Sequence, residues 1–92
     1  MDNKQKKVSV SEFERQVFDL EEVKIVVRAQ RETLVPSYDY ERKADKSASV
    51  AEWSNSRIKP ALNGLEFDVI KGDGGIPHGR SKMETVRSSY KE

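Results

Sequence analysis

The chain has 92 residues, no cysteine and a formal net charge of +1, with 35% hydrophobic and 36% charged residues. This length fits one small domain with a thin core, and it excludes a two-domain enzyme. The lack of cysteine excludes disulfides and thiolate chemistry, and no stretch approaches the roughly 20 apolar residues of a membrane span. We therefore expect a soluble, cytoplasmic protein that carries no export signal and binds no membrane.

The N-terminus predicts a short arm ahead of a single domain. Residues 1–8 are polar and contain several lysines, so we expect a flexible basic N-terminal arm. Residues 9–92 are typical of helix, strand, an uncertain segment, helix, strand, glycine loop and helix in turn. This order predicts a small single α+β domain in which a short β-sheet packs against two or three helices.

The first predicted helix begins near residue 9. Two overlapping capping boxes start it, Ser9 with Glu12 and Ser11 with Glu14, because a serine oxygen can accept a free helix N–H while the glutamate reaches back. An apolar stripe at spacings of three and four residues then predicts an amphipathic helix whose stripe lies in the core. The stripe consists of Val10, Phe13, Val17 and Leu20.

Residues 21–60 contain a clear strand pattern, an ambiguous segment and a helix pattern. Residues 21–31, EEVKIVVRAQR, alternate β-branched and charged side chains and predict a strand. Residues 32–48 contain Pro36 and fit a short helix, an edge strand or a loop equally well. A third capping box, Ser49 with Glu52, predicts a helix that Pro60 ends.

The C-terminal third predicts a strand, a loop and a helix. LEFDVIK at residues 65–71 alternates apolar and acidic residues, as expected of a strand with one solvated face. After the loop, Ser81 and Glu84 form a further capping box. The apolar side chains that follow it predict a short helix: Met83, Val86 and Tyr90.

The loop at residues 72–81, GDGGIPHGRS, comes close to a phosphate-binding pattern. From Gly74 it fits G-x-x-x-x-G-R-S, with Arg80 in place of the lysine of G-x-x-x-x-G-K-[ST]. The arginine, Pro77 and the short chain all disfavour a nucleotide-hydrolysing site. Two interpretations stay open: a type I′ turn at Asp73-Gly74 followed by a helix cap, or a loop that contacts an anion beside a helix N-terminus.

The candidate contact residues are basic or aromatic. Tyr38 and Tyr40 lie near basic residues and predict either a stacking patch for nucleic-acid bases or ordinary interface tyrosines. His78 is the only histidine, so a histidine metal site is excluded, and we expect neither a catalytic set nor a cofactor. The full candidate set for a partner or nucleic acid is Arg28, Arg31, Tyr38, Tyr40, Arg42, Lys43, His78, Arg80, Lys82 and Arg87.

The chain resembles small bacteriophage anti-CRISPR proteins that inhibit type I-F CRISPR–Cas systems. The resemblance rests on size, on the cysteine-free charged composition, on EEVKIVVRAQRETLVPSYDYERKADKSASVAEWSNSRIKPALNGLEF and on GDGGIPHGRSK. It implies a non-enzymatic inhibitor that binds subunits of the RNA-guided surveillance complex in the host bacterial cytoplasm and blocks target DNA binding.

The charge of the chain favours one mode of inhibition over another. A net charge of +1 with basic clusters disfavours imitation of a DNA duplex, and favours docking on protein subunits with a basic face toward the guide RNA or the path of the target strand. Two alternatives stay open: a small phage-derived module that binds RNA or single-stranded DNA, and a small structural phage protein that oligomerises. No small-molecule substrate is expected.

Overall fold

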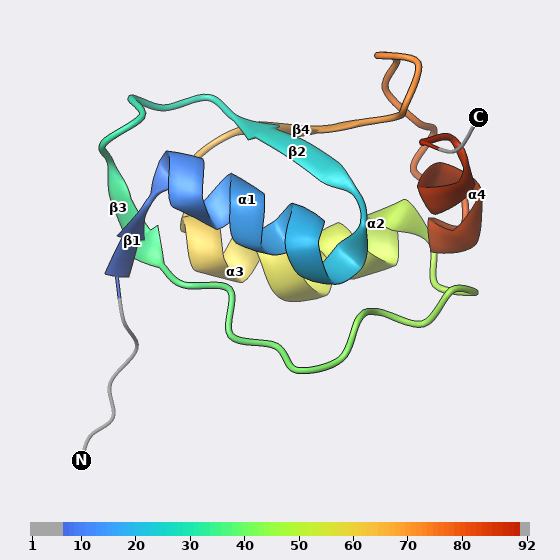
Figure 1. Cartoon of the computed structure of the whole chain (residues 1–92), viewed down its shortest axis with the longest axis horizontal. Helices are drawn as coiled ribbons and strands as arrows, with labels where there is room; N and C mark the ends of the chain where they lie inside the picture. Colours follow the sequence, from blue (N-terminus) through green and yellow to red (C-terminus); the bar gives the residue numbers. More distant parts are fainter. Residues whose placement is uncertain (1–6, 91–92) are drawn as a thin grey trace.

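A computed structural model describes residues 7–90, which form the predicted α+β domain. Figure 1 shows β1 and β3 at one end of the molecule and α4 at the other, with α1 and the second helical stretch running between them. Two antiparallel sheets form, β1 with β3 and β2 with β4. The elements are β1 (Lys7–Ser9), α1 (Val10–Glu21), β2 (Lys24–Val27), β3 (Leu34–Pro36), α2 (Val50–Trp53), the π-helical η1 (Ser54–Ile58), α3 (Lys59–Leu62), β4 (Phe67–Ile70) and α4 (Met83–Ser88).

Of the two capping boxes predicted for the first helix, one forms in part: the serine side chain of Ser9 accepts its hydrogen bond. The Ser9 side chain accepts a hydrogen bond of 3.1 Å from the Glu12 N–H at the N-terminus of α1. Glu14 does not reach back to Ser11, because its Oε2 accepts the N–H of Val27 at 2.8 Å. Glu14 therefore joins α1 to the end of β2.

The strands β2 and β4 confirm the predicted alternation. Val23, Ile25 and Val27 are buried, whereas Val26 on the opposite face is 38% exposed. Ile25 pairs with Val69 in the antiparallel register. These side chains close one side of the core.

The segment at residues 32–48, which the sequence left open, contains one short strand and a long loop. Leu34–Pro36 pairs antiparallel with Lys7–Ser9, and no further helix or strand forms before α2. Lys7 and Val8 belong to β1, so the arm predicted for residues 1–8 does not extend that far. The rest of the predicted arm, residues 1–6, lies outside the described residues.

The second helical stretch continues past the proline that was expected to end it. Pro60 lies at the start of α3, and the chain stays helical to Leu62. In a regular α-helix the Pro60 ring would meet the carbonyl four residues earlier, and the wider π-helical turn of η1 directly before it relieves that conflict. The helix ends at Asn63, which has φ 49°.

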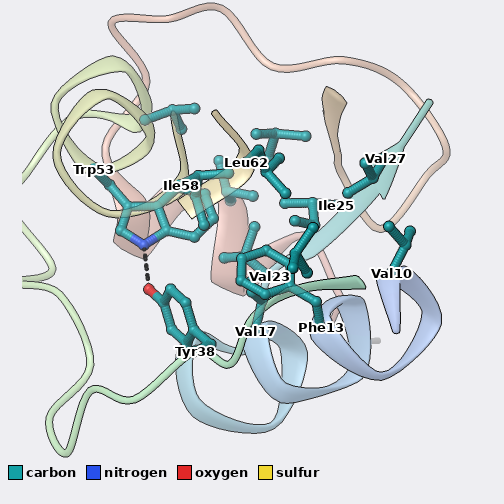
Figure 2. Close-up of a cluster of buried hydrophobic side chains, with 14 of the residues drawn as sticks. Val10, Phe13, Val17, Val23, Ile25, Val27, Tyr38, Trp53, Ile58 and Leu62 are labelled. Atoms are coloured by element: carbon teal, nitrogen blue, oxygen red, sulfur yellow. Dashed lines mark hydrogen bonds between the residues drawn. The ribbon is translucent and has the colours of Figure 1, made fainter. Parts of the chain in front are cut away.

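The core forms where α1, β2 and the α2–α3 stretch converge (Figure 2). Trp53 and Phe13 are the largest buried side chains, at 1% and 0% exposure, as their place on apolar stripes predicted. The Trp53 Nε1–H donates to the Tyr38 hydroxyl at 3.0 Å, the dashed line in Figure 2. The aromatic core is therefore connected to polar groups contributed by the long loop.

Candidate functional site

A buried carboxylate organises the polar interior of the molecule. Glu21, at the end of α1, is 0% exposed. It accepts hydrogen bonds from the Tyr38 hydroxyl at 2.6 Å, Arg57 Nη1 at 2.7 Å, Arg87 Nη2 at 3.0 Å and the Ala44 N–H at 2.8 Å. A buried charge of this kind is tolerated only when it is paired and hydrogen-bonded. The Glu21 network thus joins α1, the long loop, η1 and α4.

Two candidate contact residues belong to this network instead of the surface. Arg87 also donates to the Glu21 carbonyl at 2.7 Å and the Ala44 carbonyl at 2.9 Å, and its side chain is 11% exposed. Tyr38 is 7% exposed, and burial together with its hydrogen bond to Glu21 raises the pKa of its hydroxyl. The polar groups of both residues are already used inside the molecule, so the structure does not support a contact between them and a partner.

Two further candidate arginines are exposed but paired with carboxylates. Arg28, the residue directly after β2, contacts Asp68 at 2.6 Å and Glu66 at 3.3 Å, and these carboxylates raise the pKa of its guanidinium. Arg31 contacts Glu14 at 2.9 Å. Neither arginine therefore presents an uncompensated positive charge to a partner.

Most side chains of the stacking patch predicted within residues 38–46 contact other parts of the molecule. Tyr40 is 43% exposed, but its ring lies 4.9 Å from that of Tyr38, and the Arg57 guanidinium lies over it at 4.3 Å. Lys43 forms an ion pair with Glu22. Arg42 is exposed, and its carbonyl accepts Arg57 Nη1 at 2.8 Å. These contacts organise the loop and leave little of the Tyr40 ring face for a base.

The glycine loop begins with a tight turn, although not the predicted type I′ turn. Lys71 donates to the Gly75 carbonyl at 2.7 Å and accepts from the Gly74 N–H at 2.9 Å. The predicted type I′ turn needs positive φ at both Asp73 and Gly74, whereas in this loop only Gly74 has a positive φ, of 91°. The turn that forms is closed between Lys71 and Gly74, so its central residues are Gly72 and Asp73. No strand follows the turn, so no hairpin forms.

The backbone segments that precede α2 and α4 cap each other: each segment supplies carbonyls to the first N–H groups of the other helix. The N–H groups of Val50 and Ala51 in α2 donate to the carbonyls of Ser81 and Gly79, at 2.8 and 3.0 Å. In return, the N–H groups of Met83 and Glu84 in α4 donate to the carbonyls of Ala48 and Lys46, at 2.8 and 3.1 Å.

This exchange excludes anion binding by the backbone N–H groups at the two helix starts, while contact through Arg80 and Lys82 stays a prediction. The N–H groups that would bind an anion are already satisfied at both helix starts. Ser81 does not cap α4 as predicted, because the N-cap residue is Lys82 and no side chain caps that helix. The loop is therefore no phosphate cradle, and only its side chains remain for contact.

Those side chains form a small basic surface that we call the cationic loop site, consisting of His78, Arg80 and Lys82. They line an open hollow of about 410 Å³ together with Ser47 and Ser49. All three are exposed, and within residues 7–90 neither Arg80 nor Lys82 forms an ion pair with a carboxylate. The cationic loop site is thus the cluster of the candidate set whose charges stay available to a partner, and Arg42 is a further exposed cation outside it.

The loop backbone holds these side chains in place. His78 Nδ1 accepts the Arg80 N–H at 3.1 Å, and the Ser81 N–H donates to the His78 carbonyl at 2.9 Å. With Nδ1 as an acceptor, a neutral His78 carries its proton on Nε2 and presents it as a donor. Glu52 is the one carboxylate that lines the hollow, and its Oε1 accepts a hydrogen bond of 3.0 Å from the Ser49 N–H.

Sequence reasoning missed Glu21, the residue with the most buried polar contacts. A signal was present, because Glu21 follows Val17 by four residues and so continues the apolar stripe of α1. A charged residue on a core-facing stripe predicts a buried ion pair. Its partners, however, come from residues 36 and 66 positions away, and sequence spacing does not reveal them.

Within residues 7–90, no helix has the length and apolar content needed to cross a membrane. No protein-family model, curated protein or solved structure matches the chain, so the site is interpreted from its own geometry.

Proposed function

We propose that this protein is a non-enzymatic inhibitor that binds a type I-F RNA-guided surveillance complex in the bacterial cytoplasm and blocks target DNA binding. The observation that carries the proposal is the cationic loop site, where Arg80 and Lys82 project from a loop held by reciprocal helix capping. Cations fixed in this way suit contact with phosphate groups of a guide RNA or a target strand. The sequence resemblance indicates which ribonucleoprotein to test.

The chemistry of the cationic loop site favours contact with backbone phosphates. A guanidinium, an ammonium and an imidazole N–H are donors without acceptor capacity toward a ligand, and such groups bind phosphate without reading base edges. The hollow contains no Phe, Tyr or Trp on which a base could stack, and apart from the His78 imidazole its other lining residues are small or polar. Binding through this site should therefore be independent of nucleic-acid sequence.

The number of available cations favours a protein complex over free nucleic acid. Two or three phosphate contacts give a weak interaction at physiological salt. Glu84 lies two residues after Lys82, and Asp45 lies two residues before Ser47, which lines the hollow. Both are exposed carboxylates that reduce the positive potential of the site. A stable complex would need additional protein–protein contact, as expected for an inhibitor docked on the subunits of a surveillance complex.

A binding assay with guide-loaded complex tests the proposal directly. The purified protein is mixed with a type I-F surveillance complex, and its retention and the capture of target DNA are read in the same assay. We expect a stable complex that no longer captures target DNA. Retention of free RNA without binding to the complex would instead support the nucleic-acid module, and failure to bind either would contradict both.

A paired variant assigns the contact to the cationic loop site. The double substitution Arg80→Ala with Lys82→Ala should lower affinity for the complex about tenfold or more, equivalent to the loss of roughly 1.4 kcal/mol or more. The matched control is Lys24→Ala with Lys59→Ala, which removes the same charge from exposed positions elsewhere. Equal affinities of the two double variants would remove the cationic loop site from the interface.

A further inference from the structure

A second surface of the molecule, a groove between β3 and α3, has no role in the function proposed above. Two hollows of about 320 and 330 Å³ share the lining residues Pro36, Pro60 and Ala61, and therefore form one continuous groove. One end is lined by Leu34 and the other by Tyr40. We call this surface the β3–α3 groove. It belongs to the β1–β3 end of the molecule, whereas the cationic loop site lies next to α4 (Figure 1).

The edge of β3 in this groove carries unpaired backbone groups. Val10 donates to the Thr33 carbonyl at 2.8 Å, and Val8 faces Val35 in the register. Hydrogen-bonded and non-hydrogen-bonded pairs alternate along an antiparallel ladder, so Leu34, between these two rungs, directs its N–H and C=O away from β1. No other described residue is hydrogen-bonded to them. An open strand edge of this kind is a template for an added strand.

The side chains at this end of the groove are apolar. Leu34 is 64% exposed, among the most exposed large hydrophobic residues in the part of the chain that the structure describes. Pro60 is exposed, and Leu65 and Ala61 are half-buried beside it. An apolar surface adjoining an open strand edge offers both main-chain hydrogen bonds and a pocket for an alternate side chain.

The opposite end of the groove offers one donor and one acceptor. Arg57 Nη1 donates to Glu21 and to the Arg42 carbonyl, and the guanidinium also interacts with the Tyr38 hydroxyl and lies over the Tyr40 ring. A plane of five N–H donors still has capacity toward a ligand in the hollow. Asp39 lines the same hollow, and its Oδ1 accepts the Ser37 hydroxyl at 2.7 Å. A guanidinium and a carboxylate in one hollow complement an amide, which supplies a C=O to the first and an N–H to the second.

We propose that the β3–α3 groove binds a short extended polypeptide segment of another protein. The segment pairs its main chain with Leu34, places an apolar side chain against Leu34 and Pro60, and presents an uncharged amide to Arg57 and Asp39. Pro36 has no N–H, so the added strand is limited to a few residues. This inference is independent of the cationic loop site and of its proposed partner.

A random peptide library provides the probe, since the partner protein is unidentified. Dodecapeptides displayed on phage are selected on the immobilised full chain, and the selected sequences are synthesised. We expect uncharged peptides with apolar residues at every second position and an Asn or Gln beside them. Chemical-shift changes on titration should concentrate at residues 34–40 and 57–65.

Variants on the protein and on the peptide then test the binding mode. Leu34→Asp should weaken binding of the selected peptides at least tenfold, whereas Ile76→Asp should leave it unchanged, because Ile76 is equally exposed at 64% but lies outside the groove. Methylating the peptide nitrogen that pairs with the Leu34 carbonyl should weaken binding by a similar factor. Both variants alter exposed side chains, and unchanged thermal unfolding will show that the fold is intact.

Three outcomes would overturn the inference. Selection of no binding peptide would exclude a peptide groove, as would selected peptides that bind Leu34→Asp and the unmodified chain equally. A concentration-dependent dimer that Leu34→Asp abolishes would assign the strand edge to a second copy of this chain. Because the assay contains neither RNA nor the surveillance complex, its result does not depend on whether the inhibitor function holds.

Discussion

The hydroxyl of Tyr38 donates a hydrogen bond of 2.6 Å to the carboxylate of Glu21 and accepts one of 3.0 Å from Trp53 Nε1. The Tyr38 ring also packs edge-on against Phe13, with ring centroids 5.7 Å apart. One side chain of the long loop thus links the apolar core to the buried ion pairs. Because the Glu21 carboxylate and the Tyr38 hydroxyl are both hydrogen-bonded, loss of one of them leaves buried partners without compensation.

Removal of the Glu21 charge should be strongly destabilising. In Glu21→Leu, the guanidinium groups of Arg57 and Arg87 lose the carboxylate between them, and breaking a buried ion pair in this way costs about 3–5 kcal/mol. Urea unfolding measures the loss, with Asp19→Leu on the exposed face of the same helix as control. A change in unfolding free energy below about 1 kcal/mol would show that the network contributes little to stability.

Arg87 and Arg80 should separate stability from binding. Arg87→Ala removes donors from Glu21 and from the Ala44 carbonyl, so we expect a loss of about 3 kcal/mol in unfolding free energy. Arg80→Ala changes an exposed side chain without an ion pair and should stay within about 0.5 kcal/mol. Thermal and urea unfolding of the two variants provide the test. Equal stability of the two variants would contradict the placement of Arg87 in the interior.

Local sequence signals predicted the elements that depend on local chemistry. The Ser9 cap, the apolar stripe of α1 and the alternation at residues 23–27 all follow from neighbouring residues, and the structure confirms them. The Ser49–Glu52 capping box also forms with both hydrogen bonds present. The α+β class followed from this order of elements.

Long-range contacts decided the features that the sequence did not predict. Ser81 does not cap α4 as predicted, because the N–H groups at the start of α4 donate instead to the backbone carbonyls of Lys46 and Ala48. Arg87 was assigned to the surface because its partner Glu21 lies 66 positions away. Pro60 did not end its helix because the preceding turn is π-helical. Within the candidate site, the sequence therefore identified the exposed cations but not which of them the fold already uses.

Gly72 should resist substitution for a steric reason. A Cβ atom built at Gly72 would lie 2.0 Å from the Ser89 carbonyl oxygen, which belongs to the backbone after α4 and cannot rotate away. Forced into this contact, Gly72→Ala should lose about 1–3 kcal/mol of unfolding free energy. Gly79→Ala is the control, since its Cβ would meet the Ala51 Cβ at an ordinary 3.5 Å. Comparable urea midpoints for both variants would show that the backbone at Ser89 can shift away from Gly72 at little cost in free energy.

Alkaline pH should weaken the fold through two tyrosines, the buried Tyr38 and the partly buried Tyr90. Burial, followed by the hydrogen bond to Glu21, raises the pKa of Tyr38, and burial also raises the pKa of Tyr90, whose hydroxyl bridges the Lys24 N–H and the Ile70 carbonyl between β2 and β4. A tyrosine in the unfolded chain loses its proton near pH 10. Above that pH the unfolded state binds fewer protons than the native state, so the unfolding free energy falls as pH rises.

For Tyr38 the decline should approach about 1.4 kcal/mol per pH unit, with a smaller contribution from the partly exposed Tyr90, and it should be absent below about pH 9. Urea unfolding between pH 8 and pH 11.5 measures the slope. Tyr38→Phe removes one contribution and should flatten the curve, although its stability at neutral pH is already lower because Glu21 and Trp53 lose a partner. Tyr40→Phe changes an exposed ring outside the Glu21 network and should keep the full slope. An equal slope of unfolding free energy against pH in Tyr38→Phe and Tyr40→Phe would contradict the prediction. It would mean that Tyr38 loses its proton as readily in the native state as in the unfolded chain.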